Sequence, residues 1–136
     1  MSRVLFDTNV ISELIRPKPD PKVAAFVLAQ ADPLISVVTL HEISYGAERA
    51  PLARRAKLAA WIAAIRAQFA GRILPVTEDV AMEAGRLRAL AEAQGRPAEA
   101  VDAMIAASAI ARGAAVVTRN TSDFEPFGVT IIDPWN

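Results

Sequence analysis

Residues 3–15 outline a buried strand that leads directly into a helix. The run 4–6 is short and apolar, and it stops at Asp7. Apolar residues then recur at helical spacing: Val10, Ile11, Leu14 and Ile15. A strand followed at once by a helix is the opening unit of a parallel α/β sheet. Because the crevice of an open α/β sheet lies outside the carboxyl ends of its strands, we expect Asp7 to point into that crevice.

Asp7 also has a simpler interpretation. Asp, Thr and Asn are all good N-caps, so Asp7 with Thr8 and Asn9 suits the start of the next helix. Taken alone, the stretch favours this capping role. The choice depends on whether other acids reach the same edge of the sheet.

The rest of the chain alternates between predicted strands and helices. Apolar runs predict strands at residues 34–38, 72–76, 115–118 and 129–132. Helical spacing and capping residues predict helices at residues 22–30, 39–49, 52–69, 77–93 and 99–112, and a polar loop at 119–127. This alternation predicts an α/β fold with one domain over residues 1–136. We expect a three-layer α/β/α sandwich with a mostly parallel central sheet.

Composition excludes several kinds of site. The net charge is +0, with 15 basic and 15 acidic residues, so no overall positive field favours nucleic acid. Twelve of the basic residues are Arg, which suits phosphate well. The absence of Cys excludes disulfides and thiolate metal sites, and a single His, His41, excludes a two-histidine ribonuclease mechanism. With no signal peptide pattern and no apolar run of about 20 residues, we expect a soluble cytoplasmic protein that does not enter the membrane.

Four acids are expected at the carboxyl edge of this sheet. Asp7 ends the first strand, Glu42 follows the second, and Asp123 follows the strand at 115–118. Asp102 lies near the start of a helix that runs antiparallel to the strands, and that helix therefore begins at the same edge. Converging carboxylates repel each other unless a positive charge lies among them. A hard cation such as Mg²⁺ or Mn²⁺ would relieve this repulsion, and its chemistry suits phosphodiester hydrolysis.

Each acid keeps an alternative structural role. Thr39 and Glu42 match a capping box, in which the glutamate bonds back to the backbone of the first residue. Both roles can coexist for Glu42. Asp102 lies among apolar neighbours, where an unpaired charge is costly, so we expect a partner for it. Asp123 also suits a plain loop.

Four segments, taken together, resemble the PIN-domain ribonucleases, in particular the VapC-like toxins of bacterial toxin–antitoxin modules. The segments are LFDTNVISEL with Asp7, SVVTLHEISYG with Glu42, VDAMIAASAI with Asp102 and VVTRNTSDF with Asp123. Each is weak alone, but all four occur in the family's order and together span nearly the whole chain.

The resemblance implies a Mg²⁺- or Mn²⁺-dependent endoribonuclease acting on RNA. By analogy, Asp7 and Asp102 hold the metal most directly, and Glu42 and Asp123 complete the set directly or through water. Thr118 would orient one of these carboxylates. Supporting or turn residues around the acids are expected to be Thr8, Asn9, Thr118 and Asn120. The resemblance further implies a homodimer that a cognate antitoxin silences, with DNA contacted only indirectly through that antitoxin.

Two other functions compete with this hypothesis. A phosphatase with Asp7 as covalent nucleophile needs a second acid two residues later, where this chain has Asn9. A non-catalytic α/β module that only binds partners has no need for converging carboxylates. Metal-dependent RNA cleavage that Asp7→Asn abolishes would separate the nuclease from the module.

The antitoxin site is expected between the helices of residues 39–69. A peptide lying in a groove there would contact Trp61 or Tyr45. An inhibitory arginine that reaches the acidic pocket is electrostatically reasonable. The sequence does not separate such a groove from the dimer surface.

Overall fold

Short parallel strands form the centre of the fold in the computed structural model, which describes residues 3–136. The strands β1 (Arg3–Phe6), β4 (Ala114–Val117) and β5 (Ile131–Ile132) pair in the order β1-β4-β5. A second pair consists of β2 (Ile35–Ser36) and β3 (Ile73–Leu74), and a bridge between Leu5 and Leu34 joins it to β1. All strand pairs within residues 3–136 are parallel, as helical crossovers require.

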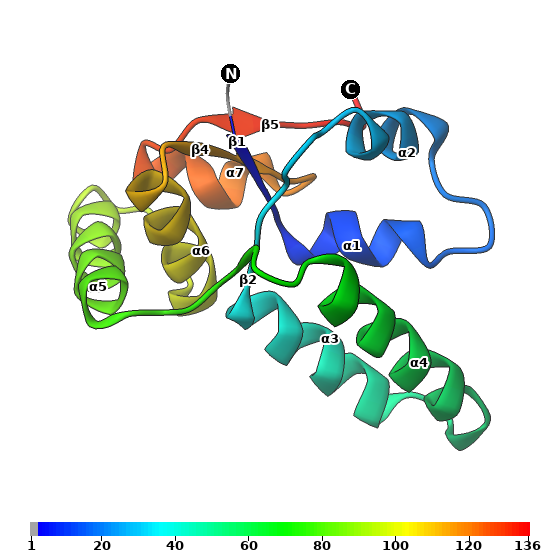
Figure 1. The fold of residues 1–136 in the computed structure, drawn as a ribbon. Coiled ribbons are helices and arrows are strands. Elements are labelled where there is room, and N and C mark those ends of the chain that lie inside the picture. The colour runs from blue at the N-terminus through cyan, green and yellow to red at the C-terminus, as the bar shows by residue number, and fades with distance from the viewer. Residues whose placement is uncertain (1–2) are drawn as a thin grey trace.

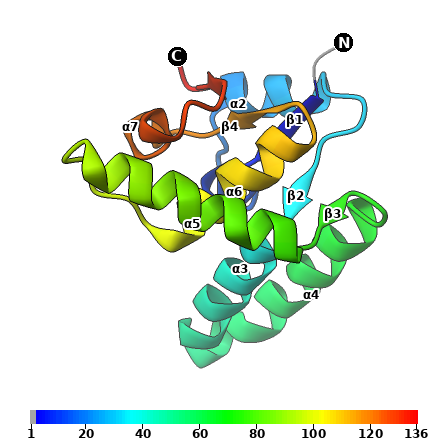
Figure 2. The same cartoon turned by 90° about the vertical axis from the view of Figure 1, so that its left-hand side faces the viewer.

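Seven α-helices surround these strands within the described chain (Figures 1 and 2). They are α1 (Thr8–Leu14), α2 (Pro21–Leu28), α3 (Val37–Arg49), α4 (Leu52–Gln68), α5 (Glu78–Ala93), α6 (Ala100–Ala111) and α7 (Thr121–Phe124). A short 3-10 helix, η1 (Glu125–Phe127), follows α7. In Figure 1, α5 and α6 lie on one side of the strands, and α1 and α2 lie on the other. The helices α3 and α4 form a hairpin that extends beyond the carboxyl ends of the strands.

Alternate strand residues contribute to two separate hydrophobic cores. Leu5 and Val116 belong to a core that includes side chains of α5 and α6. Phe6 and Val117 belong to a second core with side chains of α1, α2 and α4. Because successive side chains of a strand point to opposite faces, the sheet is covered on both sides. The predicted three-layer α/β/α sandwich is confirmed.

The predicted strand at 34–38 is too long. Its strand part ends at Ser36, whose hydroxyl accepts a hydrogen bond from the Val38 N–H at 3.0 Å. Ser36 is therefore the N-cap of α3, and the helix begins at Val37 rather than Thr39. The apolar run obscured this boundary, because a buried strand and the first turn of a buried helix have the same composition.

The predicted polar loop at 119–127 is also wrong, because the chain there forms α7 and η1. Phe124 and Phe127 are both buried, and their rings meet edge-to-face with centroids 6.4 Å apart. The polar residues that precede Phe124 concealed an i, i+3 apolar pair, which is helical spacing. Thr77 is the N-cap of α5, since its hydroxyl accepts from the Val80 N–H at 3.2 Å. No helix within residues 3–136 is long and apolar enough to cross a bilayer.

Candidate active site

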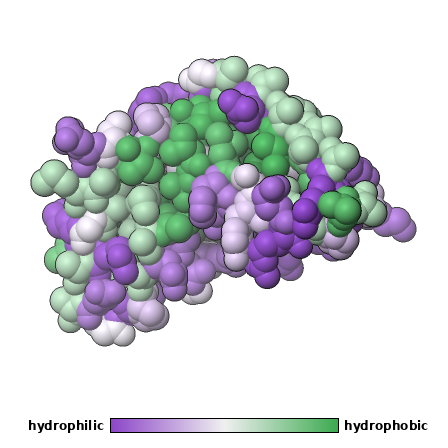
Figure 3. All heavy atoms as spheres, turned by 90° about the horizontal axis from the view of Figure 1, so that it is seen from below, coloured by the Kyte–Doolittle hydropathy of each residue, from purple (hydrophilic) through white to green (hydrophobic). Residues whose placement is uncertain are grey.

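A pocket of about 330 Å³ opens among the carboxyl end of β1, α3 and the first turn of α6. Three of the four predicted acids line it: Asp7, Glu42 and Asp102. The other lining residues are Thr8, Asn9, Ser12 and Asn120. Figure 3 shows the molecule from the side to which the carboxyl ends of the strands point, where hydrophilic side chains lie beside a broad hydrophobic area.

Asp7 performs both of its predicted roles at once. Its Oδ1 accepts a hydrogen bond from the Thr8 N–H at 2.8 Å, which caps α1. Its Oδ2 accepts from the Thr118 hydroxyl at 2.8 Å and faces the amide of Asn9 at 3.4 Å. Burial raises the pKa of the Asp7 carboxyl, the bonds from Thr118 and Thr8 lower it, and the charges of Glu42 and Asp123 raise it again. The cap thus fixes a carboxylate that also lines the pocket.

A polar network behind Asp7 joins the end of β4 to α1. The buried Thr118 hydroxyl accepts hydrogen bonds from the Asn120 N–H at 3.0 Å and the Asn9 side-chain amide at 3.2 Å. The Asn9 Oδ1 in turn accepts from the Arg119 N–H at 3.3 Å. Since the Thr118 hydroxyl donates its own proton to Asp7, the two bonds that this hydroxyl accepts also restrain the Asp7 carboxylate.

The Glu42 carboxylate is hydrogen-bonded to a residue of α1, and not to the N-terminus of its own helix, α3. Its Oε1 accepts a hydrogen bond from the Thr8 hydroxyl at 2.5 Å. The capping box predicted for Thr39 and Glu42 is wrong, because both residues lie inside α3 after the true N-cap at Ser36. Glu42 is half-buried, and its carboxylate belongs to the pocket.

Among the acids that line the pocket, Asp102 is the one whose pKa is raised furthest. It lies in the first turn of α6 and is half-buried. Burial raises the pKa of its carboxyl to about 7, and the negative charges of Asp7, Asp123, Glu42 and Glu99 contribute to the rise. No basic side chain lines the pocket, and the ion pairs within residues 3–136 do not include these acids. A partner for Asp102 was predicted, and the described residues do not supply one.

Asp123 lies at the margin of this group. It is exposed in the first turn of α7 and does not line the pocket. It is still close enough for its charge to raise the pKa values of Asp7 and Asp102. Three predicted acids therefore share the pocket, and the fourth acts on it through its charge.

The carboxylates of this pocket suit a divalent ion that keeps several water ligands better than an ion bound by protein ligands alone. Within residues 3–136, no three His, Asp or Glu side chains form a ready-made metal cage. Mg²⁺ does not require one, because it usually keeps several waters and takes only one or two carboxylates directly. The uncompensated negative charge around Asp102 is what such an ion would neutralise.

Two polar residues of this region were not predicted as part of the site. Ser12 lines the pocket, one turn beyond Thr8 on α1. Its i, i+4 spacing from Thr8 could have indicated this. Thr39 was assigned only to a helix cap, but its hydroxyl lies 3.1 Å from that of Thr8.

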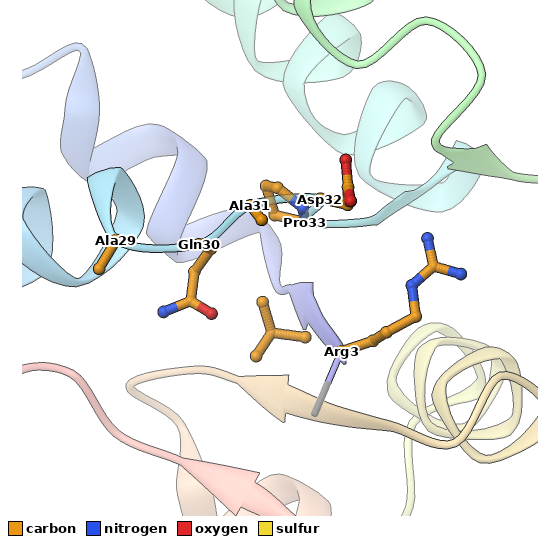
Figure 4. A pocket seen from close by; sticks show the side chains of 7 residues that line it. Arg3, Ala29, Gln30, Ala31, Asp32 and Pro33 are labelled. Carbon is orange, nitrogen blue, oxygen red and sulfur yellow. The ribbon is translucent and has the colours of Figure 1, made fainter. Parts of the chain in front are cut away.

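A cavity of similar size lies at the other end of β1 and does not resemble a catalytic site. It measures about 350 Å³ and is lined by Arg3, Val4 and residues 29–33. Figure 4 shows its side chains, with a single Arg and a single Asp among small and neutral residues. Because this cavity has no cluster of like charges, we assign the candidate active site to the acidic pocket, which is lined by Asp7, Glu42 and Asp102.

Comparison with known proteins identifies the family. The sequence model of the PIN domain matches residues 4–126 of this chain. The chain belongs to the PIN-domain family. This match confirms the resemblance inferred from the four segments that contain Asp7, Glu42, Asp102 and Asp123.

Proteins that match this PIN domain over nearly their full length include two that are named as nucleases. It is 36% identical to VapC ribonuclease Y4jK of Sinorhizobium fredii, over 97% of both chains. It is also 36% identical to the tRNA(fMet)-specific endonuclease VapC of Shigella flexneri, over 100% of both. The crystal structure of FitAcB from Neisseria gonorrhoeae superposes with a TM-score of 0.91 at 34% identity, covering 97% of this chain and 98% of that one. Structural neighbours also include members of the VapBC family of toxin–antitoxin systems.

Proposed function

We propose that this PIN domain is a Mg²⁺- or Mn²⁺-dependent endoribonuclease and the toxin of a toxin–antitoxin module. One observation carries the proposal: Asp7, Glu42 and Asp102 come from three separate elements into one pocket, and none of residues 3–136 adds a basic side chain to its lining. Such a pocket has unbalanced negative charge that a divalent cation relieves. The nuclease names of the relatives support RNA as the substrate.

Asp7 and Asp102 would hold the ion most directly, and Glu42 and Asp123 would complete the set directly or through water. When bound, such an ion polarises a phosphoryl oxygen and lowers the pKa of a coordinated water. Thr118 and the Thr8 N–H keep the two oxygens of Asp7 in fixed directions. Because burial and neighbouring acids raise its pKa to about 7, the Asp102 carboxyl is only partly ionised at neutral pH, and a bound cation would favour the ionised form.

The phosphatase alternative gains no support from the geometry. The residue two positions after Asp7 is Asn9, and its amide faces Asp7 Oδ2 and Thr118 Oγ1. It restrains a carboxylate and offers no carboxylic acid that could protonate a leaving group. A module that only binds partners would likewise gain nothing from neighbouring acids whose charges raise the pKa of Asp102.

The partner proposals rest on a second groove and on the relatives. A groove of about 410 Å³ lies between α1, α3 and α4, within the region predicted to bind the antitoxin. It is lined by the apolar side chains Ile15, Ile43, Leu58 and Trp61 and by Arg49 and Arg54. We propose that an antitoxin peptide lies there, with Trp61 as an anchor. Tyr45 does not line the groove, because it is exposed and stacks with His41.

We further propose a homodimer, and contact with DNA only through the antitoxin. Several large apolar side chains of α5 and α6 are exposed, including Met82, Leu90 and Ile110. Sedimentation of the isolated chain at increasing concentration tests the dimer.

The test of the nuclease is cleavage of a broad panel of structured RNAs. We expect Mg²⁺ or Mn²⁺ to support cleavage, EDTA to stop it, and Asp7→Asn to abolish it while the fold is retained. Asp32→Asn is the control, because Asp32 is an exposed loop acid outside the pocket. Activity that persists in chelator would remove the metal from the mechanism, and equal inertness of wild type and Asp7→Asn would favour the binding module.

A further inference from the structure

A chain of two hydroxyl groups lies behind Glu42 and crosses from α3 to α1. The Thr8 Oγ1 lies 2.5 Å from Glu42 Oε1 and 3.1 Å from Thr39 Oγ1. Thr39 and Glu42 are one turn apart on α3, and Thr8 begins α1. Thr8 therefore lies between two residues of another helix and contacts both.

The direction of these bonds follows from counting protons. A hydroxyl carries one proton and can accept through its lone pairs, and a carboxylate only accepts. The 2.5 Å contact is typical of a hydroxyl that donates to a charged carboxylate, so the single Thr8 proton points to Glu42. The 3.1 Å contact then requires Thr39 to donate to Thr8.

The buried position of the Thr39 hydroxyl favours this hydrogen bond to Thr8. Its side chain is 0% exposed, and the contact with Thr8 is the one side-chain hydrogen bond the structure gives it within residues 3–136. A buried hydroxyl without a partner is destabilising, so Thr39 keeps the Thr8 oxygen in a fixed position. The Thr8 hydroxyl then holds one oxygen of Glu42.

This arrangement leaves the other Glu42 oxygen for the pocket. Oε2 accepts no hydrogen bond from residues 3–136, whereas Oε1 is held by Thr8. Thr8 also donates its N–H to Asp7, so a single residue connects two of the acids that line the pocket. We propose that Thr39 is a positioning residue that acts through Thr8 to orient Glu42 toward a bound divalent ion or its water. The inference rests on the proposed function, because the orientation of Glu42 matters to catalysis only if the pocket holds such an ion.

Mn²⁺ affinity of the full chain, measured by titration calorimetry, is the first readout. Thr39→Val keeps the shape of the side chain and removes the donor, and we expect it to raise the Mn²⁺ Kd about 10-fold, as loss of an outer hydrogen bond typically does. At saturating Mn²⁺ the KM for RNA should stay the same while kcat falls. Thr39→Ser keeps the hydroxyl and should restore the affinity. Ser108→Ala is the matched control, because it removes a buried hydroxyl that donates to the Met104 carbonyl, away from this chain of bonds.

A second experiment tests whether Thr39 affects Mn²⁺ affinity through Glu42. In a Glu42→Gln background, Thr39→Val should produce no further loss of Mn²⁺ affinity. An equal loss in that background, or a Thr39→Ser variant as impaired as Thr39→Val, would overturn the proposal in favour of a packing role. If Thr39→Val does not fold, Thr8→Val changes a half-exposed residue and interrupts the same chain, and unchanged affinity there also overturns it.

A readout on metal-free protein separates this inference from the proposed function. The carboxyl-carbon NMR resonance of Glu42 should move in Thr39→Val and stay in place in Thr39→Ser. An unmoved resonance in Thr39→Val overturns the positioning role, whether or not the protein is a nuclease. Wild-type protein that neither binds Mn²⁺ nor cleaves RNA would instead refute the proposed function.

Discussion

Replacing Asp102 with Asn should stabilise the metal-free protein, although it should abolish the proposed activity. The Asp102 carboxyl is half-buried beside other acids, and its pKa is raised from 3.8 to about 7. The folded protein therefore binds this proton more tightly than the unfolded chain does. Between these two pKa values the stability falls as the pH rises, because the unfolded state releases its proton first. Asn carries no charge and removes this pH-dependent loss.

The size of the effect follows from the shift. A rise from 3.8 to about 7 corresponds in full to roughly 4 kcal/mol. The side chain is half-exposed, so water screens much of this, and we expect about 1–2 kcal/mol in practice. For a domain of this size, that raises the melting temperature by roughly 3–8 °C. The gain should be largest above neutral pH and should vanish near pH 4.

Thermal melts followed by circular dichroism in EDTA, across this pH range, measure the effect. Asp32→Asn removes an exposed loop acid and should melt like wild type at every pH. Added Mg²⁺ should stabilise wild type through binding linkage and leave Asp102→Asn nearly unchanged, so the gap between them narrows. An Asp102→Asn variant that is less stable than wild type in EDTA above neutral pH would refute this reasoning and indicate a structural role for the carboxylate.

Three further outcomes are expected. Ser36→Ala removes the N-cap of α3 and should lower the free energy of unfolding by about 1 kcal/mol in urea denaturation; an unchanged midpoint would contradict the helix start at Val37. Thr118→Val removes the hydroxyl that donates to Asp7 and should reduce RNA cleavage about 10- to 100-fold, with Thr118→Ser retaining most of it. Trp61→Ala should weaken inhibition by the proposed antitoxin without changing the proposed RNA cleavage by the free chain; unaltered inhibition would contradict binding of the peptide in this groove.

The convergence of the acids was predictable because topology alone determines it. Asp7 ends a parallel strand, and Asp102 begins a helix that returns antiparallel to the sheet. These positions meet at one edge whatever the details of packing. The capping role of Asp7 did not compete with its place in the pocket, since one oxygen caps α1 and the other accepts from Thr118. Local and long-range interpretations were both correct there.

The partner of Glu42 could not be predicted for a specific reason. A threonine three residues before a glutamate has the same spacing at a helix start, where it forms a capping box, and inside a helix, where it does not. Only the contact with Thr8, a residue 34 positions before Glu42, distinguishes the two cases. Ser36 was placed inside the predicted strand, because the apolar Val37 and Val38 after it suit a strand as well as a helix.

The acidic pocket also predicts how RNA binding depends on the metal. RNA is a polyanion, and a pocket lined by Asp7, Glu42 and Asp102 with no basic side chain repels phosphate when no cation is bound. Above neutral pH, where Asp102 is ionised, metal-free wild type should therefore bind RNA more weakly than metal-free Asp102→Asn, although the proposed function expects that variant to be inactive. Fluorescence anisotropy with labelled RNA in EDTA compares the two, and rising salt should reduce the difference by screening. Equal affinities at low salt would mean that RNA phosphates stay away from this pocket, and the site of cleavage would then have to lie elsewhere.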